Sequence, residues 1–265
     1  MFKDESGRLA NVPSMDTLRK TLKERSCGTG DASRDGKACK KSLMDQIGET
    51  VRGRLAEARL SQSEDETRKY ILNEFAKTGK PPSEKAIAAA MKLPALESAR
   101  LLVEKLHKAD ILTKEDGEII SAYPFSAKAT RHKVIFQDGH EVYALCATDA
   151  LGIHFMLGLD IAVRSRCPDC ENEMKIEVKD GKVVSCRPEG IVEFVSSREH
   201  CGCTAETFCP FMNFFCSVEH LEKWREKNPA YGKGEMYRLY QVLEHGKNIF
   251  GAFLKEADCD TRRQG

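Results

Sequence analysis

Cysteine is the residue type in this chain most able to do chemistry. There are eleven: Cys27, Cys39, Cys146, Cys167, Cys170, Cys186, Cys201, Cys203, Cys209, Cys216 and Cys259. The odd number excludes complete pairing into intramolecular disulfides, and the density is below that of a small disulfide scaffold. In a reducing compartment such thiols are metal ligands, catalytic groups or small buried apolar side chains.

Cys146 lies where an extended apolar pattern at 143–145 changes into a helical pattern that starts at Ala147. A helix N-terminus favours the thiolate form of a cysteine through the helix dipole and its free N–H groups. Asp149 follows three residues later, so one helical turn places its carboxylate on the same side. The pair could act as a nucleophile or ligand beside a proton carrier. The alternative is a buried cysteine that precedes an ordinary acidic residue in the first turn.

A second group of thiols has spacing that suits a metal. Cys167 and Cys170 are separated by two residues, as in a zinc knuckle, and could join Cys201 and Cys203 in an accessory zinc site. Cys-x-Cys is an unusual second half for tetrahedral zinc, so accessible thiols without a fixed metal are the alternative. Cys209 lies in a dense apolar stretch, 206–217, whose local pattern is that of a core strand.

For the remaining cysteines the sequence gives little or no chemistry. Cys186 and Cys216 are expected to be packing residues, and Cys27, Cys39 and Cys259 lie in terminal segments where the sequence assigns no role.

The composition is that of a globular protein of one or two domains. The 265 residues carry a formal net charge of +1, and mean hydropathy is −0.46. A near-neutral charge argues against a strongly electrostatic nucleic-acid binder. The N-terminal residues hold no apolar signal-like segment, and no run of about 18 apolar residues occurs. We therefore expect a cytoplasmic protein with no membrane partner.

The N-terminal half predicts helices. Residues 1–60 are expected to form a polar arm, partly helical or disordered, with one helix over 43–59. Residues 61–125 predict helices over 67–77, 83–91 and 96–106, followed by a hairpin, which is the order of a winged-helix-like domain. The third helix would be the recognition helix, but it mixes Glu97 and Glu104 with its basic residues, so nucleic-acid binding is not favoured.

The C-terminal half, 126–255, predicts mixed strands and helices before a tail at 256–265. Hairpins are expected around Asp138–Gly139 and Asp180–Gly181, and a strand over 191–195. Apolar spacing predicts helices over 147–157, 218–227 and 235–253, the last with Met236 and Tyr240 among its buried residues. The predicted fold class is α+β: a winged-helix-like three-helix domain, then a mixed or antiparallel sheet with flanking helices.

Two segments resemble the active-site segments of the organomercurial lyases, also called alkylmercury lyases. The first is Tyr143–Leu151, continuing to Gly158; the second comprises Phe208–Cys209, Phe214–Ser217 and Trp224. The resemblance covers about residues 65–255 and implies a catalytic domain over 126–255 that follows a winged-helix-like domain. Pro210 and Asn213, the paired thiols and the long N-terminal arm depart from the family pattern.

The resemblance implies roles for three residues. Cys146 and Cys209 would bind mercury, Asp149 would carry the proton, and Cys167 would match a structural cysteine. The reaction implied is protonolysis, in which R–Hg⁺ gives R–H and Hg(II). Mercury is a soft metal, for which thiolates are the fitting protein ligands. No cofactor would be required, since mercury is the substrate.

The expected partners follow from that reaction. The product Hg(II) would stay on the two thiolates until low-molecular-weight thiols, or a protein such as a mercuric reductase, remove it. A non-enzymatic reading is the alternative: a thiol-rich, winged-helix metal sensor or mercury carrier, which would not need Asp149.

Overall fold

The computed structural model describes residues 41–197 and 204–255, so Cys27, Cys39, Cys201, Cys203 and Cys259 lie outside the described residues. The helices are α2 (Leu43–Glu57), α3 (Gln62–Thr78), α4 (Glu84–Ala90), α5 (Leu96–Lys108), α6 (Ala147–Leu157), α7 (Thr204–Thr207), the 3₁₀ turn η1 (Cys209–Phe211), α8 (Val218–Lys227) and α9 (Leu239–Phe250). The strands are β1 (Leu112–Glu115), β2 (Glu118–Ala122), β3 (Phe125–Ser126), β4 (His132–Phe136), β5 (Glu141–Ala144), β6 (Ile161–Arg166), β7 (Glu173–Lys179), β8 (Lys182–Arg187), β9 (Val192–Ser196), β10 (Met212–Phe215) and β11 (Gly234–Arg238).

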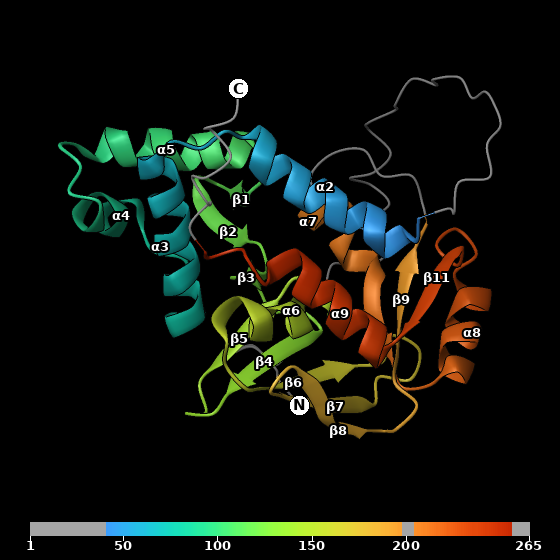
Figure 1. The fold of residues 1–265 in the computed structure, drawn as a ribbon. Coiled ribbons are helices and arrows are strands. Elements are labelled where there is room, and N and C mark those ends of the chain that lie inside the picture. The colour runs from blue at the N-terminus through green and yellow to red at the C-terminus, as the bar shows by residue number, and fades with distance from the viewer. Residues whose placement is uncertain (1–40, 198–203, 256–265) are drawn as a thin grey trace, which may run out of the picture.

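The strands form two antiparallel sheets. The larger has eight strands in the order β1-β2-β3-β5-β4-β6-β7-β8, and the smaller has three in the order β10-β9-β11. Figure 1 shows the small sheet standing beside one end of the large one. The predicted domain boundary at 125/126 falls inside β3, so the two predicted domains share the large sheet. The mixed α+β class with an antiparallel sheet is as predicted.

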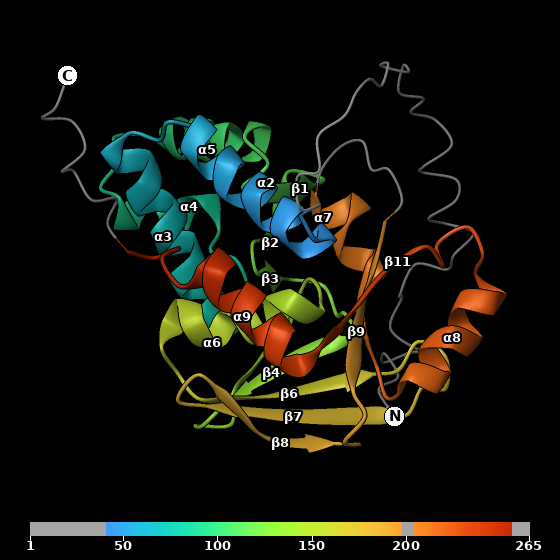
Figure 2. The same cartoon turned by 45° about the vertical axis from the view of Figure 1, so that its right-hand side comes forward.

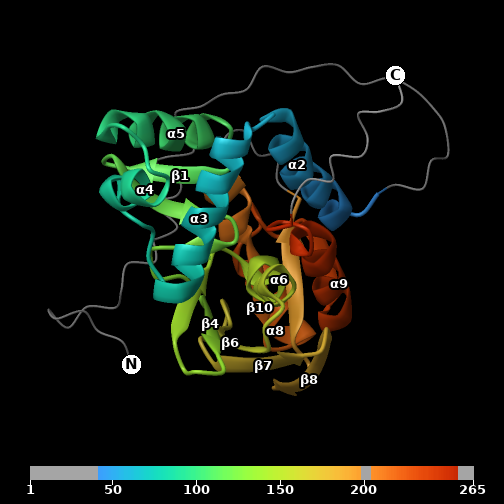
Figure 3. The ribbon, with the colours of Figure 1, turned by 60° about the vertical axis from the view of Figure 1, so that its left-hand side comes forward.

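Helix α6 lies between the large sheet and α9 (Figures 2 and 3). Nearly all of its residues are buried, from Ala147 to Met156, as expected for a helix that is apolar on all sides. Gly152 permits the close crossing, because a Cβ atom there would lie 2.2 Å from a ring carbon of Phe250 in α9. This packing fixes the N-terminal end of α6, which carries the candidate site.

Helix α2 packs along α9 and belongs to the core, although it falls in the segment predicted as a polar arm (Figure 1). Met44 is fully buried, and its backbone N–H donates to the Tyr237 hydroxyl at 3.2 Å. The guanidinium of Arg52 donates to the Asn248 carbonyl of α9 at 3.2 Å. The helix itself was predicted over 43–59; its contacts with the C-terminal half were not.

Helices α3, α4 and α5, followed by the β1–β2 hairpin, reproduce the predicted order of elements over 61–125. Ser61 caps α3 in a capping box with Glu64. On α5, Arg100 pairs with Glu84, and Lys105 pairs with Glu64. These basic side chains are therefore neutralised within the chain. The winged-helix assignment stays a prediction.

The predicted helix over 235–253 is wrong in its first part. Residues Gly234–Arg238 form β11 and pair with β9, and the helix begins only at Leu239. Met236 and Tyr240, expected to be buried, are 38% and 68% exposed. Apolar residues three and four apart fit a helix, but within β11 it is the alternation of strand faces that buries Tyr237 and exposes Met236. None of the helices in the described ranges is long and apolar enough to cross a membrane.

Candidate active site

Cys146, Asp149 and Cys209 converge in the interior. One ligand atom from each, the two Sγ atoms and a carboxylate oxygen, lies within 4.8 Å of the others. The three residues are 1%, 6% and 4% exposed. The sequence placed Cys146 and Asp149 together by helical spacing, and the fold brings Cys209 to them from 60 residues away.

Cys146 is positioned as the N-cap of α6. Its backbone is extended, with φ −146° and ψ 179°, and its Sγ accepts the backbone N–H of Asp149 at 3.4 Å. This is the place that Ser, Thr, Asp or Asn usually occupies at a helix start. The cap aims the sulfur and the Asp149 carboxylate at the same point, beside the positive end of the helix dipole.

Cys209 is the first residue of the short turn η1 and is followed by Pro210. Its Sγ donates to the Asp149 carboxylate at 3.8 Å. The chain then enters β10, which pairs with β9 in the small sheet. The apolar stretch 206–217 therefore combines a turn that presents the thiol with a core strand that holds it.

Burial dominates the electrostatics of the site. It raises the pKa of Asp149 from 3.8 to about 7, although hydrogen bonds from both thiols act in the opposite direction. It also raises the pKa of Cys146 well above the usual value. The hydrogen bond with Cys146 lowers the pKa of Cys209, but burial and the Asp149 carboxylate outweigh it and raise the pKa overall. The site therefore combines protonated thiols with a carboxyl that can hold or release a proton near neutral pH.

A second carboxyl, that of Glu193 on β9, lies next to the site. It was not predicted from the sequence. It is fully buried, and its Oε1 accepts the Thr148 hydroxyl at 2.8 Å, next to Asp149 in the chain. Burial raises its pKa from 4.5 to about 8. Its other oxygen has no hydrogen-bond partner among the described residues. The signal in the sequence was a lone acid inside an otherwise apolar strand, 191–195.

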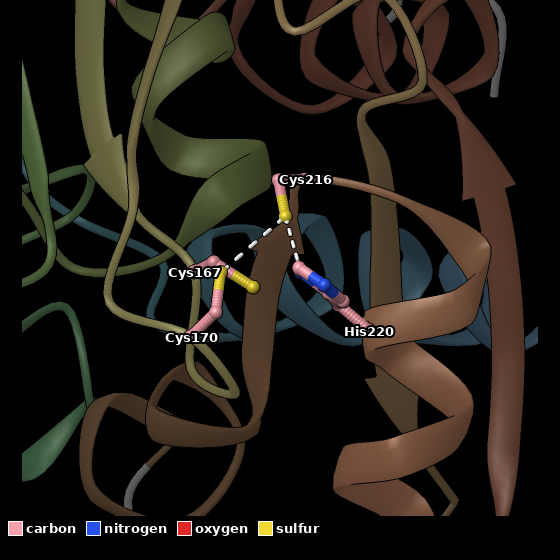
Figure 4. Close-up of side chains that lie close together, drawn as sticks. All are labelled: Cys167, Cys170, Cys216 and His220. Atoms are coloured by element: carbon pink, nitrogen blue, oxygen red, sulfur yellow. Dashed lines mark hydrogen bonds between the residues drawn. The ribbon is translucent and has the colours of Figure 1, made fainter.

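Half of the predicted accessory set lies within the described residues. Cys167 and Cys170 lie together, but the groups beside them are Cys216 and His220 (Figure 4). Cys201 and Cys203 lie outside the described residues. Cys216 was expected only to pack, and His220 was missed. The signal that could have found them is Cys-x3-His, which supplies two ligands to one side of a helix start.

Cys186 matches its expected packing role. It is half-buried against the core, and the groups that could hold a metal within the described ranges do not include it. It therefore offers a cysteine outside both clusters for use as a control.

The comparisons with known proteins agree on one family. The family model for alkylmercury lyase matches residues 125–251. An alkylmercury lyase from Staphylococcus epidermidis is 24% identical over 179 residues, which is 68% of this chain and 79% of that protein. One from Bacillus cereus is 22% identical over 162 residues, 61% of this chain and 71% of that protein.

The fold agrees as well. A crystal structure described as the mercury-bound form of MerB2 superposes with a TM-score of 0.66 at 22% identity, and covers 79% of this chain and 99% of its own.

Proposed function

Because the chain belongs to the alkylmercury lyase family through residues 125–251, we propose that it is an organomercurial lyase that breaks the carbon–mercury bond by protonolysis. One observation carries the proposal: two buried thiols and one carboxyl have their ligand atoms within 4.8 Å of one another. Thiolates capture the soft metal, and the carboxyl supplies the proton that the departing carbon requires.

Capture begins with an exchange of a proton for mercury. One thiol of Cys146 and Cys209 transfers its proton to the Asp149 carboxylate, and its sulfur binds R–Hg⁺. The buried thiols have raised pKa values, so without mercury they keep their protons. A soft cation displaces these protons despite the raised pKa values, because the S–Hg bond replaces the S–H bond. The first proton passes on to solvent.

The second thiol completes the reaction. It also gives its proton to Asp149 and binds mercury, which raises the electron density on the metal and weakens the bond to carbon. That bond breaks with its electron pair on carbon, and carbon takes the proton from Asp149. In sum, R–Hg⁺ and two thiols give R–H, a mercury dithiolate and one released proton. A pKa of about 7 suits Asp149 for both the acceptance and the donation.

The product Hg(II) remains on Cys146 and Cys209. External thiols remove it by ligand exchange, so low-molecular-weight thiols and a mercuric reductase are the partners we propose. The residues supply the thiolates and the proton, and the reaction as written uses no further cofactor.

The test is release of benzene from phenylmercury acetate by purified protein with excess dithiol. We expect turnover by the wild type and by Cys186→Ser, whose thiol lies outside both clusters. Cys146→Ser and Cys209→Ser should each lose cleavage. Wild-type protein that binds phenylmercury stoichiometrically and releases no benzene would be a carrier or sensor, contrary to the proposal.

A further inference from the structure

Four side chains outside the active site form a second cluster of metal-ligand type. Cys167, Cys170, Cys216 and His220 each place a ligand atom within 4.8 Å of the others. The sulfurs of Cys170 and Cys216 are 3.6 Å apart, and the Cys216 sulfur is 2.7 Å from His220 Nδ1. Figure 4 shows the three sulfurs and the imidazole directed toward one another.

The two halves of the cluster come from two segments that are distant in the sequence. Cys167 and Cys170 lie in the tight turn between β6 and β7, which is closed by a hydrogen bond from the Glu171 N–H to the Cys167 carbonyl. Cys216 follows β10, and His220 lies in the first turn of α8, where Ser217 is the N-cap. An ion pair between Asp169 and Lys227 at 2.6 Å joins the same turn to α8.

The spacing of the ligands in the sequence and the distance between two of the sulfurs suit a tetrahedral ion. Cys-x2-Cys with Cys-x3-His supplies three sulfurs and one nitrogen, a donor set typical of structural zinc. With Zn–S bonds of about 2.3 Å, two sulfurs on one tetrahedral ion are about 3.8 Å apart, close to the observed 3.6 Å.

We propose that Cys167, Cys170, Cys216 and His220 bind one zinc ion as a closed structural site. Binding replaces three thiol protons, which pass to solvent, and the neutral imidazole supplies the fourth ligand. Four protein ligands leave no open position for substrate, so the ion is structural. It fastens the β6–β7 turn of the large sheet to the small sheet and α8, and so holds the strand that follows Cys209.

The proposal is independent of the lyase reaction. The two clusters share no residue, and their donor sets differ: two thiols and a carboxyl in one, three thiols and an imidazole in the other. Zinc content therefore tests the second cluster whether or not phenylmercury is cleaved.

The experiment measures zinc per chain by elemental analysis in protein produced with zinc and without mercury. We expect about one zinc in the wild type, in Cys186→Ser and in Cys146→Ser, and at least a tenfold loss in Cys170→Ser and His220→Asn. The double variant Cys201→Ser/Cys203→Ser should keep its zinc. Circular dichroism checks that each variant folds.

A second measurement uses wild-type protein alone. X-ray absorption at the zinc edge should show three sulfurs and one nitrogen, and Co(II) should give the visible bands of tetrahedral thiolate coordination. A wild type that holds neither zinc nor Co(II), a site of four sulfurs, or loss of zinc in the Cys201/Cys203 double variant would overturn the proposal.

Discussion

At the scale of single residues, the chemistry arises from the surroundings of ordinary side chains. Asp149 and Glu193 are common carboxyls, but burial raises their pKa values to about 7 and about 8. Asp149 contacts both sulfurs, whereas the Glu193 carboxylate accepts a hydrogen bond from its neighbour in the chain, Thr148. We therefore regard Asp149 as the proton carrier and Glu193 as a positioning residue.

Replacing Asp149 by asparagine removes the transferable proton and keeps the shape of the side chain. We expect phenylmercury cleavage to fall by about 10²- to 10⁴-fold, the usual contribution of a general acid. Capture of mercury, followed as the loss of two titratable thiols, should still occur but more slowly, because Asp149 no longer accepts the thiol protons. Single-turnover benzene release gives the rate; cleavage at the wild-type rate by Asp149→Asn would assign the proton to another donor.

The raised pKa of Glu193 should make the free energy of unfolding depend on pH. Its pKa is about 8 in the folded protein and about 4.5 in the unfolded chain, so the folded state retains a proton that the unfolded state has lost. The free energy of unfolding should therefore be highest below pH 4.5 as far as this group is concerned, and fall as pH rises toward 8.

Glu193→Gln cannot ionise, so relative to the wild type it should gain about 1 kcal/mol per pH unit between pH 5.5 and 7.5. Urea unfolding at several pH values measures the difference. A difference between the two proteins that does not change with pH would contradict the buried, neutral state of Glu193.

These residues differ in how well their proximity could be predicted from the sequence. Cys146 and Asp149 lie within one helical turn, so local spacing predicts their proximity. Cys209 has no such relation, and only the resemblance to the lyases placed it with them. Cys216 and His220 are paired by local spacing, but their junction with Cys167 and Cys170 depends on tertiary packing between two sheets.

At the scale of elements, the site depends on how α6 crosses α9. Gly152 faces Phe250, and Gly246 of α9 lies against the Gly152 backbone, so two residues without side chains let the helices meet. Because α6 begins at the site, a shift of this crossing moves Cys146 and Asp149 relative to Cys209.

Gly152→Ala places a methyl group 2.2 Å from a buried ring carbon of Phe250, so we expect a loss of about 1–3 kcal/mol in the free energy of unfolding, together with a lower rate of cleavage. The matched control is Gly53→Ala in α2, where nothing lies within 4 Å of the added atom. That change should stabilise the protein by about 0.5–1 kcal/mol. Urea unfolding compares the two; equal effects would mean that the crossing is not tight.

The spacing of apolar residues predicts most of the helices and strands. It fails in a segment whose apolar residues fit both the helical and the strand period. The helices over 43–57 and 147–157 follow from local spacing and caps. The segment 234–250 does not, because its apolar residues fit a helix throughout. Pairing with β9, a distant strand, decides that its first five residues are extended.

At the scale of the whole molecule, the candidate active site lies where parts of both sheets meet. α6 packs on the large sheet, whereas Glu193 and the strand after Cys209 belong to the small one. Local sequence patterns cannot predict this contact between the two sheets, since the residues around Cys209 carry no signal of its proximity to Cys146. The N-terminal helix α2 adds a third part, because Met44 approaches the Thr148 hydroxyl at 3.9 Å.

Mercury held by Cys146 and Cys209 would join these parts, and a ligand that binds only the folded state stabilises it. One equivalent of Hg(II) should therefore raise Tm by several degrees, and excess dithiol should reverse the shift. Cys209→Ser should lose the shift, and Cys186→Ser should keep it. Differential scanning calorimetry measures both; a shift retained in Cys209→Ser would place the mercury elsewhere.

Cys146 both begins α6 and offers the sulfur at the site. Serine is among the best residues to begin a helix, so a chain with serine here should fold as well as this one. Loss of carbon–mercury cleavage would then leave no trace in stability or in overall likeness to the lyases. Exchange of one sulfur for oxygen can therefore end the catalytic activity while the fold stays the same, so a relative can keep the architecture of the family without being an enzyme.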